Sequence, residues 1–377
     1  MIPFNNGVLD VNTKEFLPFK KEYNFTYKLN IDYNHNLKMS NYMVDYLKHL
    51  SGNNIYSLQV IRNFLYLILT RNIKYHLALY LWGTGGSGKS VFENIIQAIS
   101  GKHVKSMTIK DLKDQHARVD LVDATVALFP DLKSYKGDVS ELKNVISGDL
   151  IGARELYKNK INFRPHCIVV MTSNLLWQPN DSTNGIQRRF IYLTINKMPK
   201  NKNINLLNYE NNIASGILLN DLPGLINWVL DADKEDLKLF NKSTLEINNL
   251  ISPNLDKEVN PLLDWININL KYDENSLCYV GNKKTDKNKT LFANYLDFCS
   301  NNGYTPMSII DFSNSLIQQL NLLWNDKEKE ITKKRTNAGV AITNTSLTNN
   351  INILENSTNN NNEYSFDIYE LLKDYIN

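Results

Sequence analysis

The feature that most constrains this chain is a glycine-rich segment between an apolar run and a helical pattern. Residues 83–90 read Gly-Thr-Gly-Gly-Ser-Gly-Lys-Ser and match G-x-x-x-x-G-K-[ST] in full. The apolar run 77–82 predicts a buried strand, and 91–99 has helical period and stops before Gly101. Strand, loop and helix in this order are the context that a phosphate-binding P-loop requires, so the segment predicts an α/β fold with a nucleotide site.

Each residue of this loop has an expected role at a nucleotide phosphate. The glycines let backbone N–H groups converge on phosphate oxygens, and the following helix adds the partial positive charge of its N-terminus. We expect Lys89 to bridge the β- and γ-phosphates of ATP and the Ser90 hydroxyl to hold Mg²⁺. The predicted nucleotide-binding residues are Gly83, Thr84, Gly85, Gly86, Ser87, Gly88, Lys89 and Ser90.

Two polar side chains follow predicted strands. Asp131 comes after the apolar run 125–129 and would place a carboxylate at the tip of a neighbouring strand, for Mg²⁺ and the attacking water. Asn174 comes after the run 167–172 and would sense the γ-phosphate and orient water. The alternatives are a cap or turn role for Asp131 and a simple Asx turn at Asn174.

A pair of arginines stands directly before a fourth predicted strand, 190–194. An arginine supplied in trans to the γ-phosphate can raise the rate by roughly a thousandfold or more. A solvated or salt-bridged strand end is the alternative. The predicted catalytic residues are Lys89, Asp131, Asn174, Arg188 and Arg189, and the predicted metal ligands are Ser90 and Asp131.

Composition limits the class of protein more than its function. A chain of 377 residues with 42% hydrophobic and 21% charged residues predicts two or three globular domains. A net charge of +3 permits a nucleic-acid partner without requiring one, so any basic footprint must be local. Three widely separated cysteines without a C-x-x-C pair argue against a disulfide framework or a zinc site.

Neither a secretory signal nor an apolar run long enough to span a bilayer is visible in the sequence. We therefore expect a soluble intracellular protein with no membrane partner. The abundance of Asn, Ile, Lys and Tyr indicates an A·T-rich genome, such as that of an organelle, plasmid or phage. The expected compartment is an organelle (plastid or mitochondrion) or the cytoplasm of a phage or plasmid host.

The order of the motifs resembles superfamily 3 helicases, in particular the phage/plasmid primase and poxvirus-type primase–helicase family. Residues 2–10 (IPFNNGVLD) are similar to that family's short N-terminal motif. Residues 141–160 contain its L-K, G-D and R-x-L-Y elements, and residues 171–174 (MTSN) match its third motif. Residues 188–189 match its arginine motif. The resemblance covers most of the chain, without the primase domain of longer relatives.

The resemblance implies an ATP-driven DNA helicase with a P-loop NTPase (AAA+-like) core that acts as a homo-hexameric ring in replication, with a primase or other replication proteins encoded separately. In such helicases a hairpin before the third motif holds single-stranded DNA in the central channel by its phosphates. Lys158 and Lys160 occupy the expected tip, with Lys143 and Arg154 nearby. Tyr157 would either stack on a base or belong to the core. An ordinary solvated basic hairpin is the alternative.

One position departs from the family pattern. Family members often carry a glutamate or two adjacent acids at the second motif, whereas Asp131 is followed by Leu132. The general base is therefore unassigned, and a second hypothesis stays open: a DNA-binding replication protein or mobile-element relic with a weak or inactive ATP site. A small-molecule P-loop kinase explains neither the segment 148–160 nor the C-terminal part of the chain.

The sequence predicts four parts. Residues 1–72 form an N-terminal segment and helical region, and 73–235 the ATPase domain. Residues 236–289 are expected to be connecting helices and a basic linker. Residues 290–377, with a basic stretch at 333–335, resemble the winged-helix domain that closes these helicases and include a partly disordered tail. A purely structural helical cap is the alternative.

Overall fold

The computed structural model describes residues 1–132, 135, 137–177, 185–195, 205–232, 234–252, 261–302, 306–324, 327, 329–348 and 368–376. The chain divides into two compact units. The first unit comprises Met1–Pro179, Ile186–Ser252 and Ser365–Asn377, and the second comprises Asn180–Gly185 and Pro253–Tyr364.

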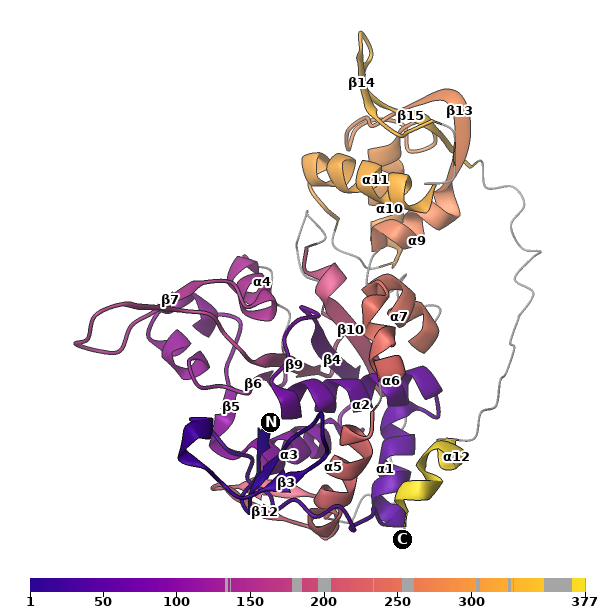
Figure 1. Ribbon diagram of the computed structural model, residues 1–377. Coiled ribbons are helices and arrows are strands. Elements are labelled where there is room, and N and C mark those ends of the chain that lie inside the picture. The colour runs from indigo at the N-terminus through magenta and orange to yellow at the C-terminus, as the bar shows by residue number, and fades with distance from the viewer. Residues whose placement is uncertain are drawn as a thin grey trace. The chain divides into compact units, whose positions relative to one another are not determined.

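A five-stranded parallel sheet with the order β10-β4-β9-β6-β5 forms the centre of the first unit (Figure 1). Its strands are β4 (Ala78–Gly83), β5 (Val104–Ser106), β6 (Val126–Phe129), β9 (Ile168–Ser173) and β10 (Phe190–Ile195). Strands β6 and β9 are buried along their whole length, because a parallel sheet is covered on both faces. The four strands predicted from apolar runs are present within one or two residues.

The position of β6 corrects one prediction. Asp131 was expected at the tip of a strand next to the P-loop strand, but β9 pairs with both β4 and β6 and separates them. A strand that is apolar along its whole length can be buried equally well at several positions in a parallel sheet. The apolar runs therefore do not specify which strands pair.

Helices α1, α2, α3 and α5 share one core cluster with side chains such as Leu79, Leu81 and Val170, which alternate along the strands of the sheet. The two helices expected between residues 41 and 71 are present. The helices of this unit before its C-terminal segment are α1 (Asn41–Ser51), α2 (Ile55–Thr70), α3 (Lys89–Ser100), α4 (Ser140–Ser147), α5 (Leu222–Leu230), α6 (Lys234–Lys238) and α7 (Thr244–Ile251).

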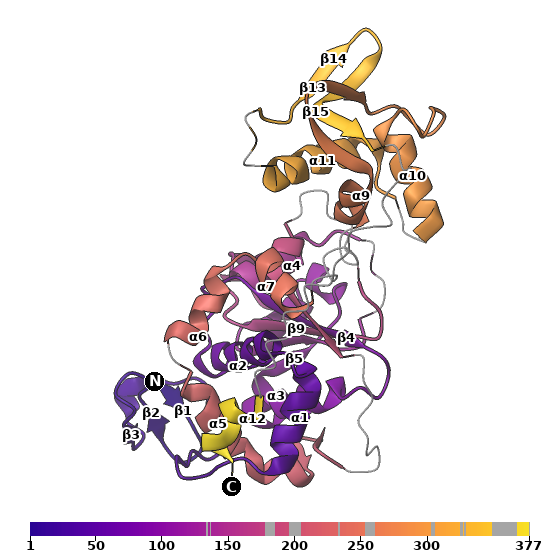
Figure 2. The ribbon, with the colours of Figure 1, turned by 90° about the vertical axis from the view of Figure 1, so that its right-hand side faces the viewer.

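Three small antiparallel sheets complete the first unit. Figure 2 shows the N-terminal one beside α5. Their strands are β1 (Ile2–Pro3), β2 (Val8–Leu9) and β3 (Phe16–Leu17); β7 (Ile151–Ala153) and β8 (Ile161–Phe163); and β11 (Asn208–Glu210) and β12 (Ile213–Ser215).

The second unit packs three helices against a three-stranded antiparallel sheet of order β13-β15-β14. Its core contains Trp265, Tyr295 and Phe312, with ring centroids of Tyr295 and Phe312 4.7 Å apart. The elements are α9 (Pro261–Asn269), β13 (Leu270–Tyr279), α10 (Leu291–Asn302), α11 (Ile309–Leu323), β14 (Lys333–Thr336) and β15 (Gly339–Leu347).

Two predicted domain boundaries are corrected. The second unit does not begin at residue 290, because β13 pairs along β15 and brings α9 with it. It also does not extend to residue 377, because α12 (Ile368–Leu372) lies beside α1 in the first unit (Figure 1). The predicted disordered tail, 343–362, begins within strand β15, so its first residues are ordered, and the part from 349 on lies outside the described residues. Within the described ranges, every helix is too short or too polar to cross a bilayer.

Candidate functional site

The segment between β4 and α3 forms a tight loop. At two of its positions, the backbone geometry disfavours any residue other than glycine. A Cβ atom on Gly83 would lie 2.0 Å from the carbonyl oxygen of Ile195 in the adjacent strand. Gly88, which directly precedes α3, has φ +101°, a conformation that residues with a side chain rarely adopt. Thr84 and the next two glycines are exposed, so the backbone of the loop faces solvent.

Lys89 lies under this loop rather than in solvent. Its Nζ donates hydrogen bonds to the carbonyl oxygens of Gly83 (2.7 Å) and Thr84 (3.0 Å) and to Ser87 Oγ (3.3 Å). Burial lowers the pKa of Lys89, while the carboxylates of Asp131 and Glu93 act in the opposite direction. The ammonium group is therefore preorganised beside the loop backbone and within electrostatic reach of two acids.

Helix α1 supports the loop from behind, which sequence reasoning missed. The Tyr46 hydroxyl donates a hydrogen bond to the Gly88 carbonyl oxygen at 3.1 Å, and His49 Nε2 lies 2.7 Å from the Ser87 carbonyl oxygen. Both partners are about 40 positions away along the chain. No local pattern links them to the P-loop, so only the tertiary fold reveals them.

The structure brings Lys89, Ser90, Asp131 and Asn174 to one edge of the sheet. The P-loop, Asp131 and Asn174 each follow the carboxyl end of a parallel strand, and such ends meet at the same edge. The ends of β6 and β9 are tied together, since Ser173 Oγ donates a hydrogen bond to the Leu132 carbonyl oxygen at 2.7 Å. The side chains of Ser90, Asp131 and Asn174 are exposed there.

Glu93 joins this group and was not singled out in the sequence. The hydroxyl of Thr172 donates a hydrogen bond to Glu93 Oε1, and the Asp131 N–H donates to the same hydroxyl oxygen at 3.3 Å. Burial raises the pKa of the Glu93 carboxyl, and the hydrogen bond from Thr172 partly opposes this. A usable signal existed, because Glu93 lies four residues after Lys89 and therefore on the same face of α3.

The two predicted arginines lie elsewhere. They end the 3₁₀ turn Gln187–Arg189, which leads into the amino end of β10. This edge of the sheet is opposite the P-loop, roughly 20 Å away for a strand of six residues. Arg189 Nη2 donates a hydrogen bond to Ser147 Oγ at 2.9 Å, whereas the Arg188 side chain is exposed. Within one chain, therefore, neither arginine is brought to the loop 83–90.

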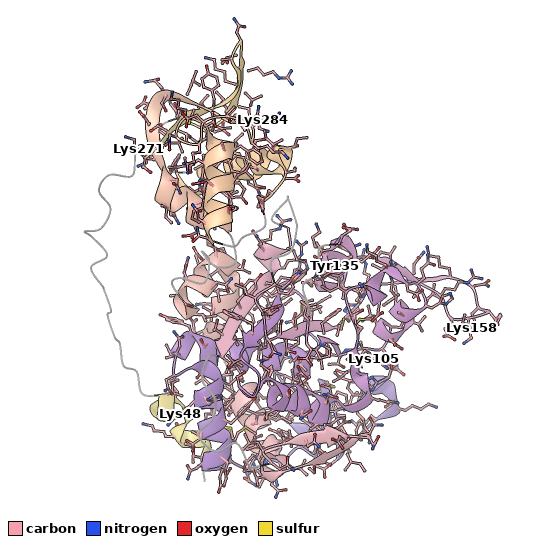
Figure 3. All side chains as sticks on the ribbon, turned by 180° about the vertical axis from the view of Figure 1, so that it is seen from behind. Lys48, Lys105, Tyr135, Lys158, Lys271 and Lys284 are labelled. Atoms are coloured by element: carbon pink, nitrogen blue, oxygen red, sulfur yellow. The ribbon has the colours of Figure 1, made fainter. Side chains whose placement is uncertain are left out.

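The predicted basic hairpin is present as β7 and β8, joined by residues 154–160. Figure 3 shows Lys158 on a projection of the first unit. Arg154 Nε donates a hydrogen bond to the Lys158 carbonyl oxygen at 3.0 Å, which closes the tip, and Lys158 pairs with Glu155. Tyr157 is 100% exposed, so the alternative that it belongs to the core is wrong.

The remaining predicted DNA contacts differ in position. Lys160 is exposed on the hairpin, whereas Lys143 lies on α4 and not at the tip. In the second unit, three exposed basic side chains follow one another on β14, and α11 carries no lysine or arginine. These basic residues are Lys333, Lys334 and Arg335.

Solved structures with similarity to this chain include two of the NrS-1 C-terminal region in apo form. One is 15% identical and covers 83% of this chain and 79% of its own, with a TM-score of 0.45. The other is 13% identical and covers 84% and 79%, with a TM-score of 0.44. The phage P4 origin-binding domain is 26% identical over 24% of this chain and 88% of its own, with a TM-score of 0.21.

Two family models match segments of the chain. A family of unknown function (DUF5906) matches residues 81–189, which contain the P-loop, Asp131, Asn174 and the hairpin. A model described as "D5 N terminal like" matches residues 1–65. This second match supports the coarser part of the resemblance seen in the sequence, a relation to phage-type primase–helicase proteins of DNA replication.

Proposed function

We propose that this chain is an ATP-driven DNA helicase of the superfamily 3 type that translocates on single-stranded DNA during replication. The observation that carries the proposal is the gathering of Lys89, Ser90, Asp131 and Asn174 at one edge of a parallel sheet. Ligands of open α/β sheets bind at this edge. The same unit carries an exposed basic hairpin with a fully exposed tyrosine.

The residues at the loop fit a nucleotide triphosphate with Mg²⁺. Hydroxyl and carboxylate oxygens, as in Ser90 and Asp131, are the donors that Mg²⁺ prefers. A bound Mg²⁺ would neutralise charge that develops on the β- and γ-phosphates. Lys89 supplies a further positive charge, and the Asn174 amide is suited to orient the attacking water.

Glu93 takes the place of the second acid that is missing after Asp131. Its carboxylate holds Thr172, which in turn accepts a hydrogen bond from the Asp131 N–H. Glu93 thereby positions Asp131 and adds negative charge near Lys89. The presence of Glu93 favours an active ATPase rather than a site that binds nucleotide without hydrolysing it.

The position of the two arginines supports a ring of several copies. Because Arg188 and Arg189 lie at the sheet edge opposite their own P-loop, we propose that they act on the γ-phosphate of a neighbouring copy. Arg188 is the better candidate, since Arg189 is engaged by Ser147. The placement of the loop and the arginines at opposite edges of the sheet supports the homo-hexamer that the family resemblance implies.

The second unit is proposed to be a winged-helix DNA-binding domain. Its element order is helix, strand, helix, helix, strand, strand, which is the order of a winged helix. The positive charge lies on the β14–β15 hairpin rather than on α11. The hairpin is therefore the expected phosphate contact.

The decisive experiment is ATP hydrolysis with and without oligothymidylate, followed by unwinding of a forked duplex. Wild type should show turnover stimulated by single-stranded DNA, and Lys89→Ala should lose at least about a hundredfold in rate. Lys242→Ala, at an exposed lysine outside the site, is the control. Unwinding by Lys89→Ala at the wild-type rate would overturn the proposal.

One observation favours a second candidate, a DNA-binding replication protein with a weak ATP site. Asp131 is exposed, and Leu132 follows it where members of the family that the chain resembles often carry a second acid. A purified protein that binds DNA but shows no ATP turnover, with or without DNA, would identify this candidate.

A further inference from the structure

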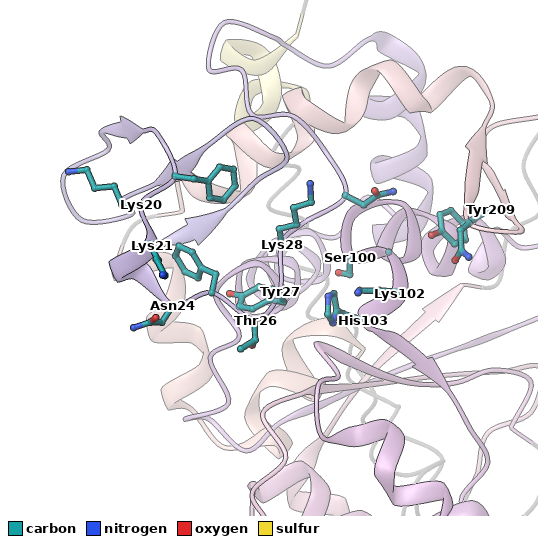
Figure 4. Close-up of a pocket in the computed structure, with 15 residues that line it drawn as sticks. Lys20, Lys21, Asn24, Thr26, Tyr27, Lys28, Ser100, Lys102, His103 and Tyr209 are labelled. Atoms are coloured by element: carbon teal, nitrogen blue, oxygen red, sulfur yellow. The ribbon is translucent and has the colours of Figure 1, made fainter. Parts of the chain in front are cut away.

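A second basic surface lies on the first unit, away from the P-loop. It is a groove of about 790 Å³, within the size range of ligand sites. Three segments far apart in the sequence form it: residues 19–30, 100–103 and 209–212. Figure 4 shows Tyr27 beside His103, with Lys28 and Lys102 near them.

The groove lies at the opposite edge of the sheet from the nucleotide site. Helix α3 begins at the P-loop and ends at Ser100. Its twelve residues give it a length of roughly 18 Å. Strand β5 starts directly after the groove at Val104, so the groove is at the amino edge of the sheet. The basic hairpin leads into the amino end of β9 and therefore belongs to the same edge.

The groove carries an excess of positive charge, although Glu22 follows Lys21 and Asp123 Oδ2 lies 3.6 Å from His103 Nδ1. Its lysines are Lys20, Lys21, Lys28 and Lys102, and all four are exposed. Among the residues that the structure describes, none of the four forms an ion pair, and no lining residue carries a carboxylate. Four exposed lysines against these two acids leave a net positive charge, which favours a polyanionic ligand.

Aromatic rings stand between these lysines. Phe19 is 48% exposed, and Phe25 and Tyr209 are partly exposed at the groove. The Tyr27 ring is held in place, with the Arg71 guanidinium 4.5 Å from its centroid and the His103 ring 6.0 Å away. Lysines that track a backbone together with aromatic faces for bases are the combination found in single-strand binding grooves.

We propose that this groove binds single-stranded nucleic acid, with its lysines at the phosphates and Phe19 and Phe25 stacking on bases. The site is separate from the hairpin Lys158 and Lys160, and it needs no ATP hydrolysis. The groove extends the contact with the nucleic-acid strand along the amino edge of the sheet.

The test measures binding of a labelled oligothymidylate to the full chain in the absence of ATP. Fluorescence anisotropy is the readout, and the measurement is repeated over a series of salt concentrations. The groove variant is Lys21→Gln/Lys28→Gln/Lys102→Gln. The control variant, Lys110→Gln/Lys113→Gln/Lys242→Gln, removes the same charge from exposed lysines elsewhere. We expect the groove variant to bind about tenfold more weakly and its logarithmic salt slope to fall by about 2, because each contact contributes about 0.7. Equal binding by the two variants would overturn the proposal.

A second arm separates nucleic acid from any other polyanion. Phe19→Ala should weaken oligothymidylate binding several-fold and leave binding of inorganic polyphosphate unchanged, because only bases stack. If the two ligands compete equally and Phe19→Ala affects neither, the groove is an anion site and the proposal is wrong.

The hairpin variant Lys158→Gln/Lys160→Gln distinguishes this inference from the proposed function. If that variant alone loses binding, the groove inference fails while the helicase proposal stands. If ATP turnover is absent but the groove variant still binds more weakly than its control, the groove inference holds without the helicase.

Discussion

Thr172 connects the acid of α3 to the acid that follows β6. Its hydroxyl donates to Glu93, and its oxygen accepts the Asp131 N–H at 3.3 Å. Asp131 has φ +46°, which is uncommon for a residue with a side chain and persists only when its surroundings fix it. The hydroxyl of one threonine thus helps to set where the exposed carboxylate stands.

We expect Thr172→Val to lower the ATP turnover number by about 10- to 100-fold with a smaller change in KM. Loss of a residue that hydrogen-bonds to a metal ligand, here the proposed ligand Asp131, usually has an effect of this size. Thr172→Ser keeps the hydroxyl and should retain most of the activity. Steady-state ATP hydrolysis over a range of ATP and Mg²⁺ concentrations measures both. Full activity in Thr172→Val would exclude the positioning role.

His103 gives the first unit a pH dependence of stability. Burial lowers its pKa below the ordinary 6.5, against the opposing effect of Asp123. Below pH 6.5 the unfolded chain therefore binds a proton more readily than the folded chain, so the free energy of unfolding falls as pH drops through the folded-state pKa. His103→Gln should reduce this loss in urea titrations between about pH 7 and 5. The exposed His35→Gln is the control, and an unchanged loss in His103→Gln would contradict the prediction.

At the scale of elements, the β7–β8 hairpin exposes its tip residue completely. Tyr157 is 100% exposed, so Tyr157→Ala should change the free energy of unfolding by less than about 0.5 kcal/mol. If the ring stacks on a base, the same variant should weaken oligothymidylate binding by about 5- to 100-fold, and Tyr157→Phe should restore it. Fluorescence anisotropy measures both variants. Unchanged binding in Tyr157→Ala would show that the hairpin acts through charge alone.

At the scale of the whole molecule, the chain leaves the first unit, forms the second, and returns. The Met39 N–H donates to the Tyr375 carbonyl oxygen at 2.7 Å, and the side chain of Leu372 is 0% exposed in the first unit's core. The C-terminal segment therefore contributes to the stability of the first unit and is not an extension of the second unit.

Two adjacent leucines test this return. Leu372→Ala should destabilise the first unit by about 2–5 kcal/mol, because it leaves a cavity in a closed core. Leu371→Ala, at a position that is 41% exposed, should change stability by less than about 0.5 kcal/mol. Thermal unfolding of both variants gives the comparison. Equal stability of the two would show that the segment does not contribute to the core.

Local order was readable in the sequence. The strand, loop and helix around Lys89 are consecutive residues, so spacing and apolar runs alone determine them. The hairpin with Lys158 at its tip was expected only from the family resemblance, and the structure contains it. The strand order, the support of the P-loop by Tyr46, the Glu93–Thr172–Asp131 chain and the return of α12 were decided only by the tertiary structure. Each of these joins residues far apart in the chain, and hydrophobic burial, being non-directional, favours many such pairings until the whole core is packed.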